Sequence, residues 1–283
     1  MSLNIVTLNC RGAIKDRLKR NILKQYLILN NANIVFLQET HTCNMDYKEI
    51  IEKEYNCLSY WSHGSYNSKG TAILIFKNFD FNVYKFERDF DGRLISILIN
   101  INSLNFKIVS IYSPNDKTQR NTFLKDLSFF LRGDTPIILA GDWNFVENLD
   151  LDKYGGNKNE GDSGSVNFRK IKEALNLKDP FRYLHKHEKI YTWFDENKQI
   201  KTRLDRFYLS SFLINKVENV ITTYSGVSDH YSVKISINLN NITFFKSGSS
   251  VWKFNNKLLE NQNFIENIEK YFQAILMILV NFL

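Results

Sequence analysis

The chain has 283 residues, of which 43% are hydrophobic and 14% aromatic, so it can bury a sizeable core and suits one large α/β domain. Its net charge of +7 favours a polyanionic partner such as nucleic acid, although a Lys-rich solvated surface gives the same charge. The three cysteines have no CxxC or Cys/His zinc spacing, which argues against a zinc site and a disulfide framework and predicts a reducing, intracellular compartment.

The first half of the chain begins with two short β-branched runs, 4–8 and 34–37, that predict buried strands. Between them, residues 17–29 carry apolar side chains at helical spacing with a basic outer face, which predicts an amphipathic helix. The stretch that follows has no helix signal, and we expect it to form an antiparallel meander. Its predicted strands are 56–61, 70–76, 82–87, 93–100 and 105–112.

The second half alternates more strongly between helix and strand patterns. Helices are expected at 118–131 and 165–175, with a loop rich in Asp, Asn and Gly at 147–164. The predicted strands are 136–140, 190–194, 203–209, 216–223 and 231–237. Strand runs with interspersed helices indicate an α/β fold in which two sheets pack face to face and helices flank them.

The character of the chain changes after Asn240. Lys246–Ser250 predicts a linker, and 251–283 a helical appendage, so we expect a domain at 1–240 followed by a separate region at 241–283. Residues 1–8 lack the pattern of a signal peptide. The apolar run 274–280 is too short to span a bilayer, so no membrane association is expected.

Polar residues of catalytic type stand at the ends of several predicted strands. Each has an ordinary structural explanation of its own, because Asn, Asp and Gly favour caps and turns and Tyr is often a core residue. Strand ends that share one edge of a sheet meet in space, however, so residues far apart in the chain can form one cluster. The residues at these strand ends are Asn9, Glu39, Tyr112, Asp142, Asn144 and the pair Asp229 and His230.

This set of motifs, in this order from Asn9 to Ile237, resembles the endonuclease/exonuclease/phosphatase superfamily, which includes DNase I and the exonuclease III class of abasic-site endonucleases. The resemblance implies a four-layered α/β sandwich with two mixed, mainly antiparallel sheets and helices outside. Further stretches are similar to the endonuclease of LINE-type non-LTR retrotransposons. These are 33–41, 69–75, 191–193, 203–208 and, in the appendage, 251–259, which is similar to the segment that leads towards a reverse transcriptase.

The resemblance also implies roles at the site. Glu39 would bind a hard divalent cation, Mg²⁺ or Mn²⁺, with Asn9 and Asp229 beside it. Asp142 would orient or deprotonate the attacking water. Asn144 would hold Asp142 and the phosphate, and His230 would contact the phosphate. Asp205 would fix the imidazole of His230, and Tyr112 would donate to a phosphate oxygen.

DNA contacts are expected at both ends of the predicted site. Arg11 replaces an acidic residue that abasic-site enzymes tend to carry, and it could touch phosphate. Residues 195–201 predict the polar tip of a hairpin between strands 190–194 and 203–209, which the resemblance implies probes a DNA groove; a merely solvated hairpin is the alternative. The other expected contacts are Asn115, Thr192, Lys198, Lys201 and Arg203.

The sequence therefore predicts a metal-dependent endonuclease that nicks one strand of double-stranded DNA and leaves a 3′-OH, for target-primed retrotransposition. It would act in the nucleus if its target is chromosomal DNA, and would continue into a reverse transcriptase. An abasic-site repair endonuclease is the main alternative. A phosphatase of the inositol or sphingomyelin branch, and a decayed copy that binds DNA without cutting it, are the others.

Overall fold

The structure is a computed structural model that describes residues 2–156, 163–195, 197–240, 262 and 265–266. The chain divides into two units, Met1–Asn241 and Ile242–Leu283. Within the second unit only 262 and 265–266 are described, and they are helical. The expected linker and the rest of the expected appendage lie outside the described residues.

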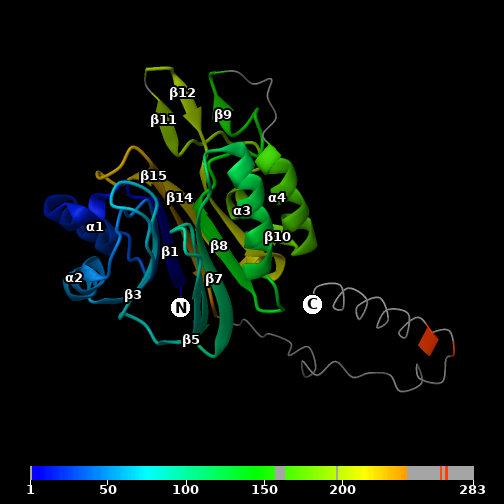
Figure 1. The fold of residues 1–283 in the computed structure, drawn as a ribbon, viewed down its shortest axis with the longest axis horizontal. Helices are drawn as coiled ribbons and strands as arrows, with labels where there is room; N and C mark the ends of the chain where they lie inside the picture. The colour runs from blue at the N-terminus through cyan, green and yellow to red at the C-terminus, as the bar shows by residue number, and fades with distance from the viewer. Residues whose placement is uncertain (1, 157–162, 196, 241–261, 263–264, 267–283) are drawn as a thin grey trace, which may run out of the picture. The chain divides into compact units, whose positions relative to one another are not determined.

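The first unit contains strands in three sheets, with helices on the outside (Figure 1). The strands are β1 (Ser2–Asn9), β2 (Ile34–Gln38), β3 (Cys57–Ser62), β4 (Thr71–Phe76), β5 (Phe81–Arg88), β6 (Leu94–Ile101), β7 (Leu104–Tyr112), β8 (Ile137–Asp142), β9 (Lys153–Tyr154), β10 (Leu177–Lys178), β11 (Trp193–Asp195), β12 (Ile200–Thr202), β13 (Asp205–Ser210), β14 (Val217–Tyr224) and β15 (Tyr231–Asn238). The helices are η1 (Ala13–Lys15), α1 (Arg17–Leu29), α2 (Asp46–Tyr55), α3 (Lys117–Phe130), α4 (Ser163–Ala174), α5 (Pro180–Leu184) and η2 (Ser211–Lys216).

Two six-stranded sheets form the body of the unit. Their strand orders are β14-β15-β1-β2-β4-β3 and β10-β13-β8-β7-β6-β5. Each sheet has one parallel pair at its centre, β1 with β2 and β7 with β8, and antiparallel pairs elsewhere. The inner faces pack together, as the contact between the rings of Phe36 and Phe207 illustrates. The expected pair of mixed, mainly antiparallel sheets is therefore confirmed.

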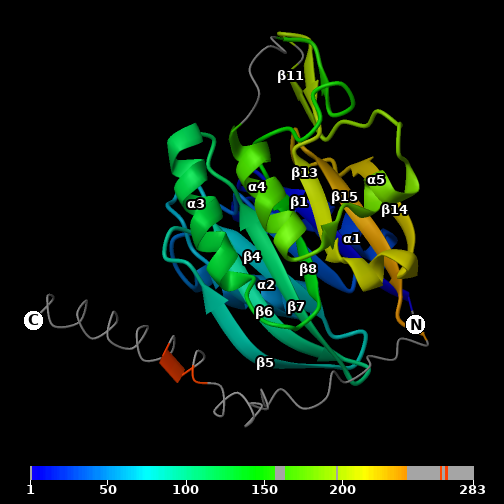
Figure 2. The same ribbon diagram turned by 90° about the vertical axis from the view of Figure 1, so that its right-hand side faces the viewer.

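Helices cover the outer face of each sheet and complete the four layers (Figures 1 and 2). Leu23 and Leu27 of α1 and Ile51 of α2 pack on the first sheet. On the second sheet, α3 and α4 bury Leu124 and Phe168 in the same way. Each helix buries an apolar stripe against apolar strand residues, which is the packing that its periodic sequence predicts.

The expected single meander at 56–112 is wrong in one respect. The strands are antiparallel, but β3 and β4 belong to the first sheet and β5, β6 and β7 to the second. The segment between β4 and β5 therefore crosses from one sheet to the other. An apolar run specifies that a strand is buried without specifying which sheet it joins, so the sequence pattern could not distinguish the two arrangements.

Candidate active site

Strand ends from both six-stranded sheets meet at one edge of the body. Asn9 ends β1 in the first sheet, whereas Tyr112 and Asp142 end β7 and β8 in the second. Asp205 begins β13 and lies opposite Asp142 in the strand register. His230 immediately precedes β15. The cluster that the motifs predict from their positions at strand ends is therefore present in the structure.

Unusual backbone conformations accompany this edge. Gly141 has a φ of 150°, and a Cβ at that position would lie 1.9 Å from the carbonyl oxygen of Ile111, so only glycine fits before Asp142. Glu39 has a φ of 50° and Asn144 a φ of 51°. Asparagine tolerates this left-handed region, but glutamate does so at an energetic cost that the surrounding contacts must offset.

Asn9 joins the two carboxylates that flank it. Its side-chain Nδ2 donates to Glu39 Oε1 and to Asp142 Oδ2, both at 2.9 Å. Burial alone would raise the pKa of Glu39, but the hydrogen bonds from Asn9 and Tyr112 and the charge of Arg11 outweigh it and hold the pKa below its usual range. Glu39 is therefore ionised at neutral pH.

Asp142, Asp205 and His230 form a buried acid–base group. His230 Nδ1 lies 2.9 Å from Asp205 Oδ2. Burial disfavours the imidazolium, but the charge of Asp205 and this hydrogen bond prevail and raise the pKa of His230 to about 9. Burial and the charge of Asp205 raise the pKa of Asp142 above its ordinary range, although His230 and Asn9 oppose them. The group thus pairs a cationic imidazole with a carboxylate whose proton affinity is increased.

This group opens into a cleft. The cleft has a volume of about 450 Å³, and Glu39, Asp142, Asn144 and His230 line it. Asp205 Oδ1 is buried and has no hydrogen-bond partner, so this carboxylate keeps one acceptor unused beside the cleft. A phosphate ester in the cleft would meet a general base, a cationic imidazole and an ionised carboxylate, which are the groups that phosphoester hydrolysis requires.

Two sets of donors at the cleft could hold a metal. Asp142, Asp205 and His230 each offer a ligand atom, and these atoms lie within 4.8 Å of one another. The Nδ1 of His230, however, is already hydrogen-bonded to Asp205 Oδ2 at 2.9 Å. Glu39 fits a hard divalent cation better, because its carboxylate is ionised and the residue lines the cleft.

Residues 6–230 match the endonuclease/exonuclease/phosphatase family. The chain belongs to this family. That membership confirms the expected superfamily and its hydrolase chemistry, and the sandwich described above is the fold expected of it.

Two relatives and one solved structure illustrate the membership. An uncharacterised 149 kDa protein of transposon TX1 from Xenopus laevis is 25% identical over 278 residues, which are 95% of this chain and 20% of that protein. A DNA-(apurinic or apyrimidinic site) endonuclease from Plasmodium berghei is 24% identical over 62% of this chain and 43% of its own length. The structure of an AP endonuclease from Archaeoglobus fulgidus aligns with a TM-score of 0.69 at 20% identity, covering 84% of this chain and 100% of that one. This chain spans less than half the length of both relatives.

The two residues expected beside the metal, Asn9 and Asp229, are both hydrogen-bonded within the protein. Asn9 directs Nδ2, not its oxygen, at both carboxylates, and its Oδ1 accepts from the backbone NH of Arg11 at 3.2 Å. Asn9 therefore orients the carboxylates by hydrogen bonding, as expected of it, and its place beside a bound metal stays a prediction. Asp229 accepts from Arg11 Nη1 and, at 3.3 Å, from the indole of Trp193. Asp205, and not Asp229, holds the His230 ring, as the sequence predicts.

Asn144 holds Asp142 from the far side. Its backbone NH donates to Asp142 Oδ1 at 3.0 Å, and its side-chain amide donates to the carbonyl oxygen of Ser113 at 2.7 Å. Asp142 thus receives one donor from Asn144 and one from Asn9, which fixes the plane of its carboxylate.

The expected hairpin exists, with different arms. It pairs β11 with β12, and β9 adds a third strand (Figure 1). These strands form a lobe that protrudes beyond the two large sheets. The expected second arm, 203–209, instead corresponds to β13 of the body. The run 190–194 overlaps β11, but the run 203–209 begins after β12 has ended. The sequence therefore located the hairpin and its first arm, and took the next strand for its second arm.

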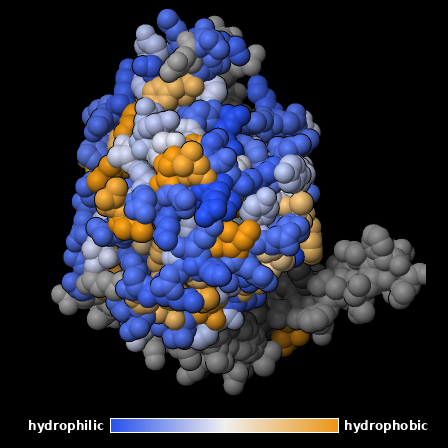
Figure 3. Space-filling model, turned by 90° about the vertical axis from the view of Figure 1, so that its left-hand side faces the viewer, coloured by the Kyte–Doolittle hydropathy of each residue, from blue (hydrophilic) through white to orange (hydrophobic). Residues whose placement is uncertain are grey.

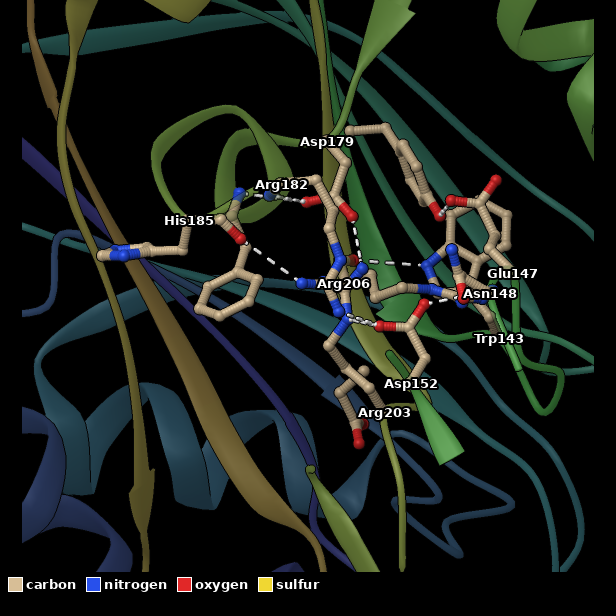
Figure 4. Close-up of polar contacts among 12 residues, drawn as sticks. Trp143, Glu147, Asn148, Asp152, Asp179, Arg182, His185, Arg203 and Arg206 are labelled. Atoms are coloured by element: carbon tan, nitrogen blue, oxygen red, sulfur yellow. Dashed lines mark hydrogen bonds and ion pairs between the residues drawn. The ribbon is translucent and has the colours of Figure 1, made fainter. Parts of the chain in front are cut away.

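Two of the expected DNA contacts are wrong because their side chains are buried. Thr192 is fully buried, and its hydroxyl accepts from the backbone NH groups of Leu204 and Asp205 at 2.9 and 3.0 Å. Arg203 is 3% exposed and binds Asp152 Oδ1 at 2.8 Å and Asp179 Oδ2 at 2.5 Å (Figure 4). Neither side chain reaches the surface where DNA would lie.

The other expected contacts lie at the surface or in the cleft. Lys198 and Lys201 are exposed on the hairpin, and Lys198 pairs with Asp195 at 3.5 Å. Asn115 and Arg11 line the cleft. They stay predictions as DNA contacts, and their positions are consistent with that role.

Sequence reasoning missed the buried ion cluster around Arg203, which Figure 4 shows. Asp152 binds both Arg203 and Arg182, and Asp179 accepts from Arg203 while capping α5 through the backbone NH of Phe181. The cluster ties β9 and α5 to the chain just before Asp205. Asp152 lies in a polar loop and Asp179 directly precedes Pro180. Neither position has a sequence pattern that would predict an ion pair.

The cysteines take no part in the chemistry. Cys10 is buried, and burial together with the charge of Glu39 raises the pKa of its thiol to about 12. Burial also raises the pKa of Cys57 to about 12, whereas Cys43 is exposed. Among the described residues, no helix is long and apolar enough to cross a membrane.

Proposed function

We propose that this chain is a divalent-metal-dependent endonuclease that nicks one strand of double-stranded DNA by phosphodiester hydrolysis and leaves a 3′-OH. The arrangement of Asp142, Asp205 and His230 beside the ionised Glu39 carries the proposal. It supplies a base, a cation and a carboxylate on one cleft, each held by hydrogen bonds within the protein.

Asp142 receives the proton of the attacking water. Its raised pKa makes it a stronger base than an exposed aspartate, and Asn9 and Asn144 hold its carboxylate in one orientation. The water oxygen forms the new bond to phosphorus while the bond from phosphorus to O3′ breaks. The leaving O3′ takes up a proton and becomes the 3′-OH, and the phosphate stays on the 5′ side.

His230 stabilises the charge that develops on the phosphate. Its pKa of about 9 keeps the ring protonated at neutral pH, and Asp205 on Nδ1 leaves Nε2 to face the cleft as a donor. Tyr112 lies at the same edge and donates its single O–H to Glu39; it can donate to a phosphate oxygen only by giving up that hydrogen bond. Preorganised donors of this kind stabilise the transition state more than the substrate.

Glu39 would hold the metal, with Mg²⁺ as the expected ion and Mn²⁺ as a substitute. When bound, such a cation neutralises charge on the phosphate and on the leaving oxygen. Asn9 and Tyr112 keep the Glu39 carboxylate oriented for it.

We infer a role in target-primed retrotransposition, which the transposon relative supports. The match to the transposon TX1 protein runs through 95% of this chain and covers only 20% of that protein, which supports a domain within a larger element protein. We infer that a reverse transcriptase follows in the full-length protein, and that the chain acts on chromosomal DNA in the nucleus.

An abasic-site repair endonuclease is the second candidate. Relatives with that name favour it, as do Trp193 and Leu204, which line the cleft next to His230 and could receive a sugar that lacks its base. Arg11 pairs with Asp229 at the rim of the same cleft.

Two duplex substrates test the proposal: an intact supercoiled plasmid and the same plasmid with abasic sites, each incubated with Mg²⁺ in the absence and in the presence of a chelator. We expect nicking of intact DNA with Mg²⁺, its loss with the chelator, and direct extension of the nicked end by a DNA polymerase. Asp142→Asn is the matched inactive control. Cutting confined to abasic plasmid would instead support the repair enzyme, and nicks that cannot be extended would contradict the 3′-OH product.

A further inference from the structure

A second cavity lies beside the cleft and takes no part in the chemistry above. Its volume is about 1150 Å³ against about 450 Å³ for the cleft, and Arg11 lines both. One wall comes from the protruding lobe, and the other from α1 and the segment between β14 and β15. We call it the lobe groove. A DNA strand whose scissile phosphate lies at His230 can continue past Arg11 into this groove.

Aromatic rings line the lobe groove on both walls. Phe194 of the hairpin meets Tyr231 edge to face at a centroid distance of 4.8 Å, and Tyr231 meets Tyr224 at 5.5 Å. Tyr224 is 60% exposed, and Tyr154, on the lobe, is 56% exposed. Phe194, Tyr231 and Tyr224 are thus held by contacts with one another, whereas Tyr224 and Tyr154 leave more than half of their surface exposed.

Cations accompany these rings. The ammonium of Lys201 lies 5.7 Å from the centroid of Tyr154 and 5.8 Å from that of Phe194. Lys19 and Arg11 line the groove as well. Its two carboxylates already have cationic partners, because Asp229 pairs with Arg11 and Asp195 with Lys198. The groove therefore favours an anionic strand.

The surrounding surface argues against an apolar protein partner. Figure 3 views the face that carries α1 beneath the lobe, where hydrophilic residues predominate and hydrophobic ones form small separate patches. Stable protein interfaces usually have a continuous apolar centre. Rings flanked by lysines, in contrast, are the pattern that binds single-stranded nucleic acid, in which bases stack on aromatic side chains and cations contact the backbone.

We propose that the lobe groove binds unpaired nucleotides of the DNA strand next to the scissile phosphate, with bases stacked on Tyr224, Tyr231 and Tyr154. The inference rests on the proposed endonuclease function. It narrows the substrate of that function to DNA whose bases are unpaired beside the nick. Paired bases are stacked on their neighbours within the duplex, so only unpaired bases can offer a face to these rings.

Binding measurements on two matched substrates test the groove. One is a fully paired duplex, and the other carries a short unpaired patch next to the same scissile position. The Asp142→Asn background prevents cutting, and fluorescence anisotropy gives the Kd. Tyr224→Ala should weaken binding of the patched substrate about 5- to 100-fold and that of the duplex less than about twofold, since one base–ring stack contributes that much. Tyr224→Phe, which keeps the ring, should retain wild-type affinity.

A control and a second variant separate stacking from loss of the fold. Tyr84 on β5 is 63% exposed, away from the groove residues, and Tyr84→Ala should leave both affinities unchanged. Tyr154→Ala, on the opposite wall, should show the same selective loss as Tyr224→Ala. Equal losses on both substrates, or none on the patched one, would overturn the proposal.

The outcomes also distinguish the groove from the endonuclease proposal. If the wild-type chain nicks paired plasmid while Tyr224→Ala has no selective effect, the groove inference fails and the endonuclease stands. If the wild type cuts no DNA and the selective effect of Tyr224→Ala persists, the endonuclease proposal fails and the groove remains a site for unpaired strands. A peptide that competes with the patched DNA at the same tyrosines would favour a protein occupant and overturn the inference.

Discussion

Two clusters of buried charge lie side by side in this molecule, and they differ in whether their carboxylates are fully paired and in whether they face a cleft. Arg203 and Asp205, neighbours on one stretch of chain, belong to different clusters. Around Arg203, every carboxylate oxygen of Asp152 and Asp179 is hydrogen-bonded, so we call this the closed cluster; of its side chains, only the Nε of Arg182 lacks a partner, and it is buried. Around Asp205, one carboxylate oxygen has no partner, and the rest of the cluster faces a cleft. Buried charge alone does not mark an active site; buried charge that lines a cleft and includes an unpaired carboxylate oxygen does.

The largest contrast between the clusters should appear in Asp142→Asn. Loss of the general base is expected to lower kcat for nicking about 10²- to 10⁴-fold. The free energy of unfolding should not fall, because burial raises the pKa of Asp142 and its ionised form therefore costs stability at neutral pH. Single-turnover nicking and urea unfolding measure the two effects. A stability loss as large as the activity loss would show that this cluster, too, is structural.

Arg203→Met should produce the opposite pattern. Removing the guanidinium leaves Asp152 and Asp179 buried without their partner, which is expected to lower the free energy of unfolding by about 3–5 kcal/mol. Urea denaturation measures it. Lys201→Met, an exposed cation nearby, is the control and should change stability by less than about 0.5 kcal/mol. If both variants unfold alike, the closed cluster contributes no stability.

Asp205→Asn should shift the pH dependence of nicking, which is the smallest of the three expected effects. His230 must be protonated in the proposed mechanism, so wild-type activity should fall as the pH rises through its pKa of about 9. Asp205 is what raises that pKa against burial; without its charge the alkaline limb should move towards or below the ordinary value near 6.5. Measuring kcat/KM for nicking as a function of pH gives the position of this alkaline limb. Asp229→Asn is the control, and it should move the limb far less. An unmoved limb would mean that another group titrates there.

The sequence predicted the layers of the fold and the cluster around Asp205 better than the closed cluster around Arg203. Strand and helix patterns located α1, α3 and the central strands, because apolar periodicity depends on burial alone. The cluster around Asp142 could be predicted because strand ends of the two sheets converge there and because the order of the motifs indicated it. The short helix α2 and the crossing from β4 to β5 were not predicted, since neither has a distinct periodic signal.

Arg203 shows why the closed cluster could not be predicted from the sequence. A basic residue beside a hairpin has the same sequence signature whether it faces solvent or two buried carboxylates. Its partners, Asp152 and Asp179, lie on separate segments that only the packed lobe and α5 bring together. Pairing of this kind depends on tertiary distances that no local spacing encodes.

The burial of Cys10 and Cys57 has a practical consequence. With both thiols inaccessible and held in the protonated form, a maleimide dye should react selectively with the exposed Cys43. Cys43 follows Glu39 closely in the chain but does not line the cleft. The native chain thus already carries a single attachment point for a fluorophore, from which the approach of a DNA strand could be followed in real time without engineering a new cysteine.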